Sequence, residues 1–232
     1  MATTPLRLIS SMATRALLAE LRDAWQAAHP EAPVEIESLG GVDAAKRVAA
    51  GEAFDAVVLA SDAIDKLIAG GHVRSGSRVD LVHSGVAVAV REGAPRPDIG
   101  SEDALRQAVR TAHSLGYSTG PSGTQLLKLF ERWGLLDELQ PKLVQAPAGI
   151  PVGRLVAEGR VELGFQQLSE LMSLPGITVV GPLPPAVQIT TTFSGSIAAV
   201  AAQADAVRAL LAWMASPATD TLKQRHGMEP AA

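Results

Sequence analysis

The sequence predicts an α/β protein with two lobes, each built on a mixed or parallel sheet flanked by helices, joined by two hinge strands. Three observations support this fold class. Short apolar runs alternate with helical patterns along most of the 232 residues, which is typical of βαβ units. Gly- and Ser-rich turns separate each run from the helix after it. Two longer alternating strands, near 84–91 and 188–201, bracket the middle of the chain.

The first block of elements begins with the apolar run LRLIS. A helix follows, in which Leu17, Leu21 and Trp25 recur at helical spacing and which stops at Pro30. PVEIESL alternates as a strand, a Gly-Gly turn follows, and a second helix ends at Gly51. FDAVVLAS is typical of a buried strand and precedes the helix DAIDKLIAGG.

The second block starts after the long strand SGVAVAVREG. Helical patterns at SEDALRQAVR, SGTQLLKLFERWG and VGRLVAEG alternate with the apolar runs SLGYS, KLVQ and VELGFQQ. A second long strand, QITTTFSGSIAAVAA, then precedes two C-terminal helices. We therefore expect one lobe of residues 1–84 with 195–232 and another of residues 85–194. A cleft between them would collect the turns at the carboxyl ends of the strands.

Composition excludes several function classes. The net charge is −4, so no basic surplus exists to bind nucleic acid. There is no cysteine, and no apolar run approaches the roughly 18 residues of a membrane span. The five histidines lack metal-ligand spacing, and no Walker A or Rossmann motif is present, so we expect neither a metal nor a cofactor.

The start of the sequence lacks a secretory signal, which predicts a cytoplasmic location as written and a periplasmic one if a leader was removed.

The stretch GYSTGPSGT, residues 116–124, has two interpretations. Gly116 to Gly120 fits the G-x-S-x-G pattern of a hydrolase, with Ser118 as nucleophile and chain order permitting Asp205 and His226 as partners. Alternatively, Ser122 caps a helix whose free N–H groups bind an anion, and Gly123 lets another group approach the backbone. No His-Gly-Gly oxyanion motif precedes Ser118, which favours the anion interpretation.

Similar turns recur before other predicted helices. Ser10 to Met12 follow the first strand, Gly40 to Val42 follow the second, and Ser61 ends the third, while Gly149 and Ile150 open the helix before Arg154. One such turn is a weak signal, because every strand-to-helix loop needs turn chemistry. Four of them, two in each lobe, could hold an anion with N–H and O–H dipoles and no fixed positive charge. Asp43 and Asp62 lie near helix starts, where we expect them to stabilise the helix dipole.

Six motifs in order resemble the molybdate-binding protein family, the solute receptors of ABC importers with a type II periplasmic-binding fold. They are ISSMATRALLAEL, GGVDAAKRVAAGEAFDAVVLASD, PSGTQLLKLFERWGLLDEL, LVAEGRVELGFQQ, VVGPLP and LLAWMASPATDTLKQRHGM, and they cover essentially the whole chain. The resemblance implies oxyanion contacts at Ser10 to Met12, Gly40 to Val42, Ser122 and Gly149. It also places the family's pocket tyrosine at Gln167. With their neighbours in the same turns, the candidate ligand-binding residues are Ser10, Ser11, Met12, Gly40, Gly41, Val42, Ser61, Thr119, Ser122, Gly123, Thr124, Gly149, Ile150 and Gln167.

The sequence departs from the family in two places. The second loop offers glycines where the family has a hydroxyl, and Gln167 replaces a phenol. Both departures favour an organic acid over molybdate. We therefore expect a solute-binding protein for a small anionic ligand, with an ABC importer permease as partner if it is exported. The alternative is a cytoplasmic enzyme, an isomerase or hydrolase, that acts on a small organic acid in the same cleft.

Overall fold

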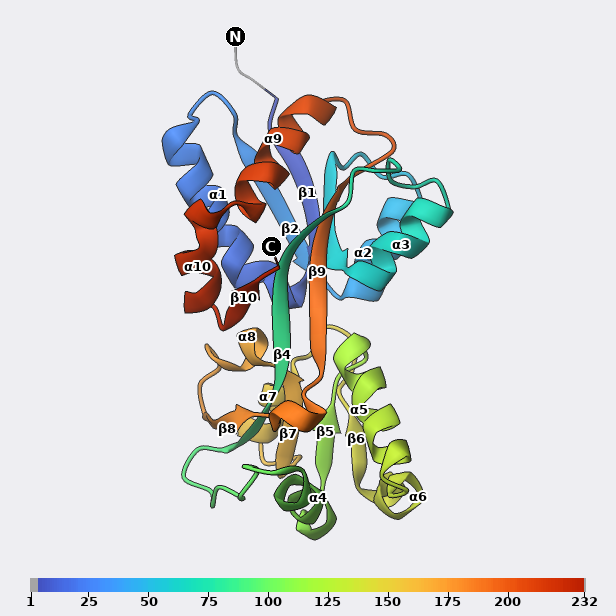
Figure 1. The fold of residues 1–232 in the computed structure, drawn as a ribbon, viewed down its shortest axis with the longest axis vertical. Coiled ribbons are helices and arrows are strands. Elements are labelled where there is room, and N and C mark those ends of the chain that lie inside the picture. Colours follow the sequence, from blue (N-terminus) through green and yellow to red (C-terminus); the bar gives the residue numbers. More distant parts are fainter. Residues whose placement is uncertain (1–3, 232) are drawn as a thin grey trace. The chain divides into compact units, whose positions relative to one another are not determined.

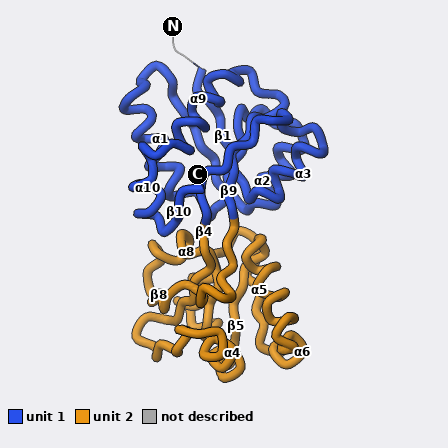
Figure 2. Tube along the Cα trace, in the orientation of Figure 1, with its two compact units in different colours: residues 1–83, 192–232 blue, residues 84–191 orange. Residues whose placement is uncertain are grey.

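The computed structural model describes residues 4–231. These residues form two compact units, one of residues up to 83 together with 192 onward, and one of residues 84–191 (Figure 2). The chain passes from the first unit to the second along strand β4 (Val79–Arg91) and returns along β9 (Thr190–Ile197). No helix among the described residues is long and apolar enough to cross a membrane.

Unit 1 is a sheet with the strand order β2-β1-β3-β9. Strands β1, β2 and β3 are parallel, and β9 is antiparallel to β3. Its elements, besides β9 and the start of β4, are β1 (Leu6–Ser11), the 3₁₀ turn η1 (Met12–Thr14), α1 (Arg15–Ala28), β2 (Val34–Leu39), α2 (Gly41–Ala49), β3 (Ala56–Ala60), α3 (Ser61–Ala69), α9 (Ala204–Ala215), η4 (Pro217–Thr219), α10 (Asp220–Arg225) and β10 (Met228–Pro230).

Helices cover both faces of the sheet in unit 1 because its strands are apolar on both sides. Leu8 of β1 packs with α1, α9 and α10, whereas the next residue, Ile9, packs with α2 and α3. Val58 and Val57 of β3 divide in the same way between the two cores. Figure 1 shows α1 and α10 on one side of β1 and β2, and α2 and α3 on the other.

Unit 2 is a sheet with the order β4-β7-β5-β6, and β8 also pairs with β4. Strands β5, β6 and β7 are parallel, while β4 is antiparallel to β7 and β8. The elements besides β4 are α4 (Glu102–Thr111), β5 (Leu115–Tyr117), α5 (Pro121–Arg132), α6 (Leu136–Leu139), η2 (Gln140–Lys142), β6 (Leu143–Gln145), α7 (Val152–Ala157), β7 (Leu163–Gln167), α8 (Leu168–Leu171), β8 (Ile177–Pro182) and η3 (Pro185–Val187).

Strand β4 alternates between valine and alanine, and the two residue types serve different cores. Val86 and Val88 pack with Phe130 and Phe165, the two large aromatic side chains of the main core of unit 2. Ala87 faces the opposite side, where it packs with α8 and β8. The small side chain allows these short elements to lie close to the sheet. The alternation therefore sets which helix covers each face.

Candidate functional site

The predicted residues of unit 1 lie at one edge of its sheet. Ser10 pairs with Ser38 of β2 and with Val58 of β3, so the three parallel strands end side by side. The loops that follow them lead directly into η1, α2 and α3. This edge brings together Ser10, Ser11, Met12, Gly40, Gly41, Val42 and Ser61.

Ser11 is the most informative of these side chains. Its residue is 7% exposed, and its Oγ has no hydrogen-bond partner among the described residues. A Cβ atom on Gly41 would lie only 3.7 Å from the Ser11 Cβ, so Ser11 adjoins the N-terminus of α2. That helix starts at N-cap Gly40 without a side-chain cap. An unpartnered hydroxyl beside an uncapped helix N-terminus is a neutral site for an anion.

The other members of this edge have different roles. Ser10 is fully buried, and its Oγ lies 2.7 Å from Ser38 Oγ, so it ties β1 to β2. Val42 is 56% exposed in the first turn of α2. Ser61 is the first residue of α3, which begins at N-cap Ala60 without a side-chain cap. Met12 is partly buried at the start of η1. Asp43 and Asp62 lie in the first turns of α2 and α3, as predicted.

The loop between β5 and α5 differs from its prediction in two respects. The N-cap of α5 is Gly120, not Ser122, because Pro121 begins the helix and moves Ser122 into its first turn. The hydroxyl of Ser122 instead lies 3.0 Å from that of Ser118. A Cβ on Gly123 would lie 1.9 Å from the Ser118 carbonyl oxygen. Gly123 therefore allows the loop to pack on its own helix, rather than making room for another group.

The two threonines of this segment flank the paired serines. Thr119 is exposed in the loop, and Thr124 is exposed in the first turn of α5. The Thr124 hydroxyl is directed back to the Gly120 carbonyl oxygen at 3.5 Å. Ser122 itself is 5% exposed. The hydroxyl pair of buried Ser122 and partly buried Ser118 is thus the polar centre of this loop.

The loop between β6 and α7 also departs from its prediction. Gly149 does not open the helix; it occupies a turn with φ +76°, and the N-cap of α7 is Pro151. Ile150 donates its backbone N–H to the Pro147 carbonyl. The N–H of Val152, the first residue of α7, is bonded to the side-chain oxygen of Gln166 at 2.7 Å. A side chain from β7 therefore already satisfies the start of this short helix.

Three polar side chains lie at the end of β7 and in the short helix α8 after it, and two of them, Gln166 and Glu170, were not singled out from the sequence. Gln166 uses its amide nitrogen to donate to Glu170 Oε1 at 2.8 Å. Burial raises the pKa of Glu170 to about 7, and this hydrogen bond opposes the shift. Gln167 does not contact Glu170 in this way. Its Nε2 donates to Thr191 Oγ1 at 2.8 Å, and its Oε1 is buried without a partner among the described residues.

The hydrolase alternative built on Ser118 gains no support. His226, its expected base, lies with Nε2 2.7 Å from Glu20 Oε2. Ser118 has the hydroxyl of Ser122 as its neighbour. His226 belongs to unit 1 and Ser118 to unit 2. The structure thus assigns each member of the expected pair a different partner.

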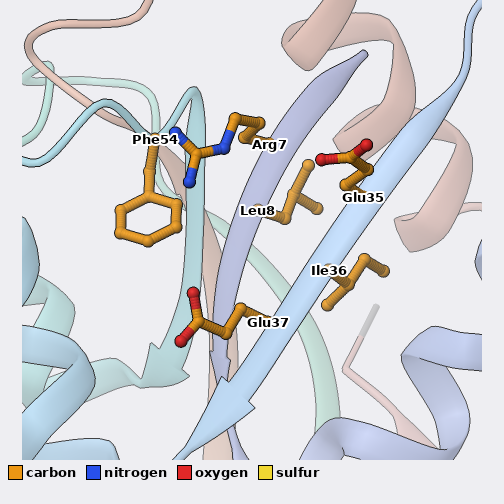
Figure 3. A pocket seen from close by; sticks show the side chains of 6 residues that line it. All are labelled: Arg7, Leu8, Glu35, Ile36, Glu37 and Phe54. Atoms are coloured by element: carbon orange, nitrogen blue, oxygen red, sulfur yellow. The ribbon is translucent and has the colours of Figure 1, made fainter.

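A surface pocket of about 160 Å³ lies apart from these loops, on unit 1. Figure 3 shows Arg7 beside Phe54, with Glu37 of β2 facing them. The guanidinium groups of Arg7 and Arg47 each lie 5.1 Å from the centre of the Phe54 ring. Arg47 also pairs with Glu37 and Glu52. Glu37 is thus already paired with Arg47, and the pocket contains none of the predicted ligand-binding residues.

The carboxyl-end loops of both units share one chemical character. They present hydroxyl groups, a side-chain amide and uncapped helix N-termini, and the candidate residues include no lysine or arginine. Such dipoles can replace the hydration shell of an anion when they are fixed and shielded from water. Each unit therefore has, at one edge of its sheet, polar groups that can bind an anion.

Comparisons with known proteins agree with this character. The family model for bacterial extracellular solute-binding proteins matches residues 6–229. An aconitate isomerase from a Pseudomonas species is 37% identical over 238 residues, an alignment that covers 99% of this chain and 90% of the relative.

Two solved structures share the fold. The periplasmic molybdate-binding protein of Azotobacter vinelandii superimposes with a TM-score of 0.78 at 20% identity, covering 96% of this chain and 98% of that one. The tungstate ABC transporter structure from Geobacter sulfurreducens gives 0.75 at 16%, covering 95% and 98%. These similarities confirm the predicted fold class and the resemblance to molybdate-binding proteins. Because the family model matches nearly the whole described chain, the protein belongs to the bacterial extracellular solute-binding protein family.

Proposed function

We propose that this protein binds a small organic polycarboxylate of the aconitate class. The observation that carries the proposal is the 37% identity with an aconitate isomerase across 99% of the chain. The structurally similar molybdate-binding protein and tungstate transporter share only 20% and 16% of their residues with it. The anion-binding character of the loops fits a ligand of this charge. The aconitate isomerase, the more similar protein in sequence, thus supports a polycarboxylate as ligand. The solute-binding family supports binding of that ligand by the loops at the ends of the strands.

The donors available suit carboxylates. Ser11 offers a buried, unpartnered hydroxyl beside the start of α2, and Ser122 offers a hydroxyl, paired with that of Ser118, at the start of α5. The side-chain amide of Gln167 has two N–H groups, which can donate to carboxylate oxygens. Hydrogen bonds to charged groups each contribute about 1.5–3 kcal/mol.

A second function, isomerisation of the bound acid, is favoured by the same relative. Aconitate carries a CH₂ group next to its carbon–carbon double bond. Removing a proton from that CH₂ and returning one at the former vinyl carbon moves the double bond. The constitution is unchanged, and the new double bond can take the other geometry. The reaction needs a group that accepts and returns a proton near neutral pH. Glu170, with its pKa at about 7, has the chemistry of that proton carrier.

A thermal-shift panel tests the ligand class. Cis-aconitate, trans-aconitate, citrate, molybdate, tungstate and sulfate would be compared at matched concentration. A ligand at ~100 times its dissociation constant adds roughly 2.7 kcal/mol, which raises the melting temperature of a chain this size by about 5–10 °C. We expect an aconitate to give the largest shift. A larger shift with molybdate or tungstate would show that the protein is an oxyanion receptor instead.

The same preparation tests isomerisation. NMR spectra of trans-aconitate incubated with the protein would show cis-aconitate if the reaction occurs. Glu170→Gln should then abolish turnover while leaving the thermal shift with aconitate in place, and Glu158→Gln, an exposed carboxylate in the same unit, serves as the control. Binding without turnover would leave a receptor, for which we propose an ABC importer permease as partner. Its location stays a prediction: cytoplasmic as the sequence is written, periplasmic if a leader precedes it.

A further inference from the structure

The side-chain amide of Gln167 is paired at one end only. The residue is 3% exposed at the end of β7. Its Nε2 donates to Thr191 Oγ1 at 2.8 Å, while its Oε1 is buried with no partner among the described residues. Burying a carbonyl oxygen without a hydrogen-bond donor is unfavourable. The outer end of this amide is therefore an unsatisfied polar position next to the predicted ligand-binding loops of unit 2.

The partner, Thr191, is held in place by the surrounding strands. It is 9% exposed and is the second residue of β9. Val86 of β4 lies opposite Gln167, and its backbone N–H is bonded to the Ile189 carbonyl at 3.0 Å. Backbone pairing thus fixes β7, β4 and the segment before Thr191 together. The backbone therefore holds Gln167 and Thr191 next to each other, so their side chains lose little freedom when they form this contact.

A hydroxyl group is the one common neutral partner that suits both ends of an amide. It accepts from N–H in one orientation of Gln167 and donates to the carbonyl oxygen in the other. In the first orientation the amide presents a carbonyl oxygen outward, which suits a ligand O–H. In the second it presents two N–H groups, which suit a carboxylate. An apolar residue at 191 would leave the inner end of the amide unpaired in both orientations.

We propose that Thr191 is a specificity-determining residue of the ligand site. In the structure the Thr191 hydroxyl accepts from Gln167 Nε2; when a carboxylate binds, the amide turns over, the same hydroxyl donates to Oε1, and the N–H groups face the ligand. Thr191 acts through Gln167 and does not itself need to touch the ligand. The inference rests on the proposed function, because it takes a carboxylic acid as the ligand.

Calorimetric titration of trans-aconitate tests the proposal with the full chain. Thr191→Val keeps the shape and β-branching but removes the hydroxyl, and we expect it to weaken binding about tenfold. Thr191→Ser keeps the hydroxyl and should stay within about threefold of the wild type. Thr190→Val is the matched control, since Thr190 is the exposed neighbour on the same strand. It should bind as the wild type does.

A double-mutant cycle separates this role from a merely structural one. Gln167→Met removes the amide, so Thr191→Val should weaken binding no further when Gln167 is already Met. Additive losses, or an unchanged Thr191→Val, would overturn the proposal. If Thr191→Val does not fold, Thr191→Ala takes its place in the cycle with the same expected result. A wild type that binds molybdate but no carboxylic acid would refute the proposed function, and this inference with it.

Discussion

Glu170 carries a partly buried carboxyl group in α8. Burial raises its pKa from 4.5 to about 7 in the folded protein. The folded state therefore holds this proton more tightly than the unfolded chain does. Between about pH 4.5 and pH 7 the unfolded state has lost the proton and the folded state has not, so stability falls as pH rises through this window. The loss amounts to at most about 3 kcal/mol.

We predict that Glu170→Gln makes the protein more stable above pH 7 than the wild type and changes little at pH 4.5. The glutamine carbonyl can still accept the hydrogen bond from Gln166. Melting temperatures at half-unit steps from pH 4.5 to 8 would measure the difference. Other carboxylates titrate equally in both proteins and cancel. A difference that does not change with pH would show that Glu170 is not a buried acid.

Single residues of the site could be predicted only where their chemistry depends on neighbours in sequence. Ser11 and Gly41 were predicted from their turns, and they do adjoin at one sheet edge. The wrong N-cap at Ser122 was avoidable, because Pro121 before it marks the first helical position. Gln166 was not predictable in its role: it bonds Val152, on a different element, and only the fold brings them together.

Among elements, the turn from β5 into α5 is the most constrained. Its loop folds back on the helix so closely that the Cα of Gly123 lies against the Ser118 backbone. The sequence motif PSGT suggested a glycine needed for a ligand, whereas the structure shows a glycine needed for packing. The elements themselves followed the predicted order, since period-2 and period-3.6 patterns are local. The long strand β4 begins at Val79, earlier than the predicted 84, because its polar start pairs with β10.

We predict that Gly123→Ala destabilises the protein by about 3 kcal/mol, because the new methyl group would meet a backbone oxygen that cannot move freely. Gly120→Ala is the control. A Cβ there would lie 3.7 Å from the nearest atom, Ser118 Oγ, which is ordinary contact, so we expect a cost of about 1 kcal/mol or less. Urea unfolding of both variants would measure the two costs. Equal costs would contradict the packing role of Gly123.

At the scale of the whole molecule, each hydrophobic core belongs to one unit. The cores around Leu8 and Ile9 draw only on residues of unit 1. Those around Phe130, Leu155 and Ala87 draw only on residues 84–191. The predicted lobes were 1–84 with 195–232, and 85–194. The units in the structure change over at 83/84 and 191/192. The alternating patterns mark the two long strands, but they do not mark the residue at which the side chains change from the core of one unit to the core of the other.

We predict that a fragment of residues 84–191 folds without the rest of the chain. It has its own cores, and its ends are held together by the hydrogen bond between Val86 and Ile189. Near-UV circular dichroism and dispersed amide signals in NMR would show fixed tertiary structure. The discontinuous remainder, joined by a short Gly/Ser linker, offers the reciprocal experiment. A fragment that unfolds without cooperativity would show that the cores depend on one another.

The placement of unit 2 as an insertion has a consequence for synthesis on the ribosome. The sheet of unit 1 is completed by β9, and its core by Val207, Leu211 and Met214, near the end of the chain. All of residues 84–191 must be translated between the two halves of that unit. At roughly 5–20 residues per second this takes on the order of ten seconds. The nascent first half, with one apolar face of its sheet covered only in part by α1, must stay unaggregated for that time, while unit 2 emerges complete and can fold first.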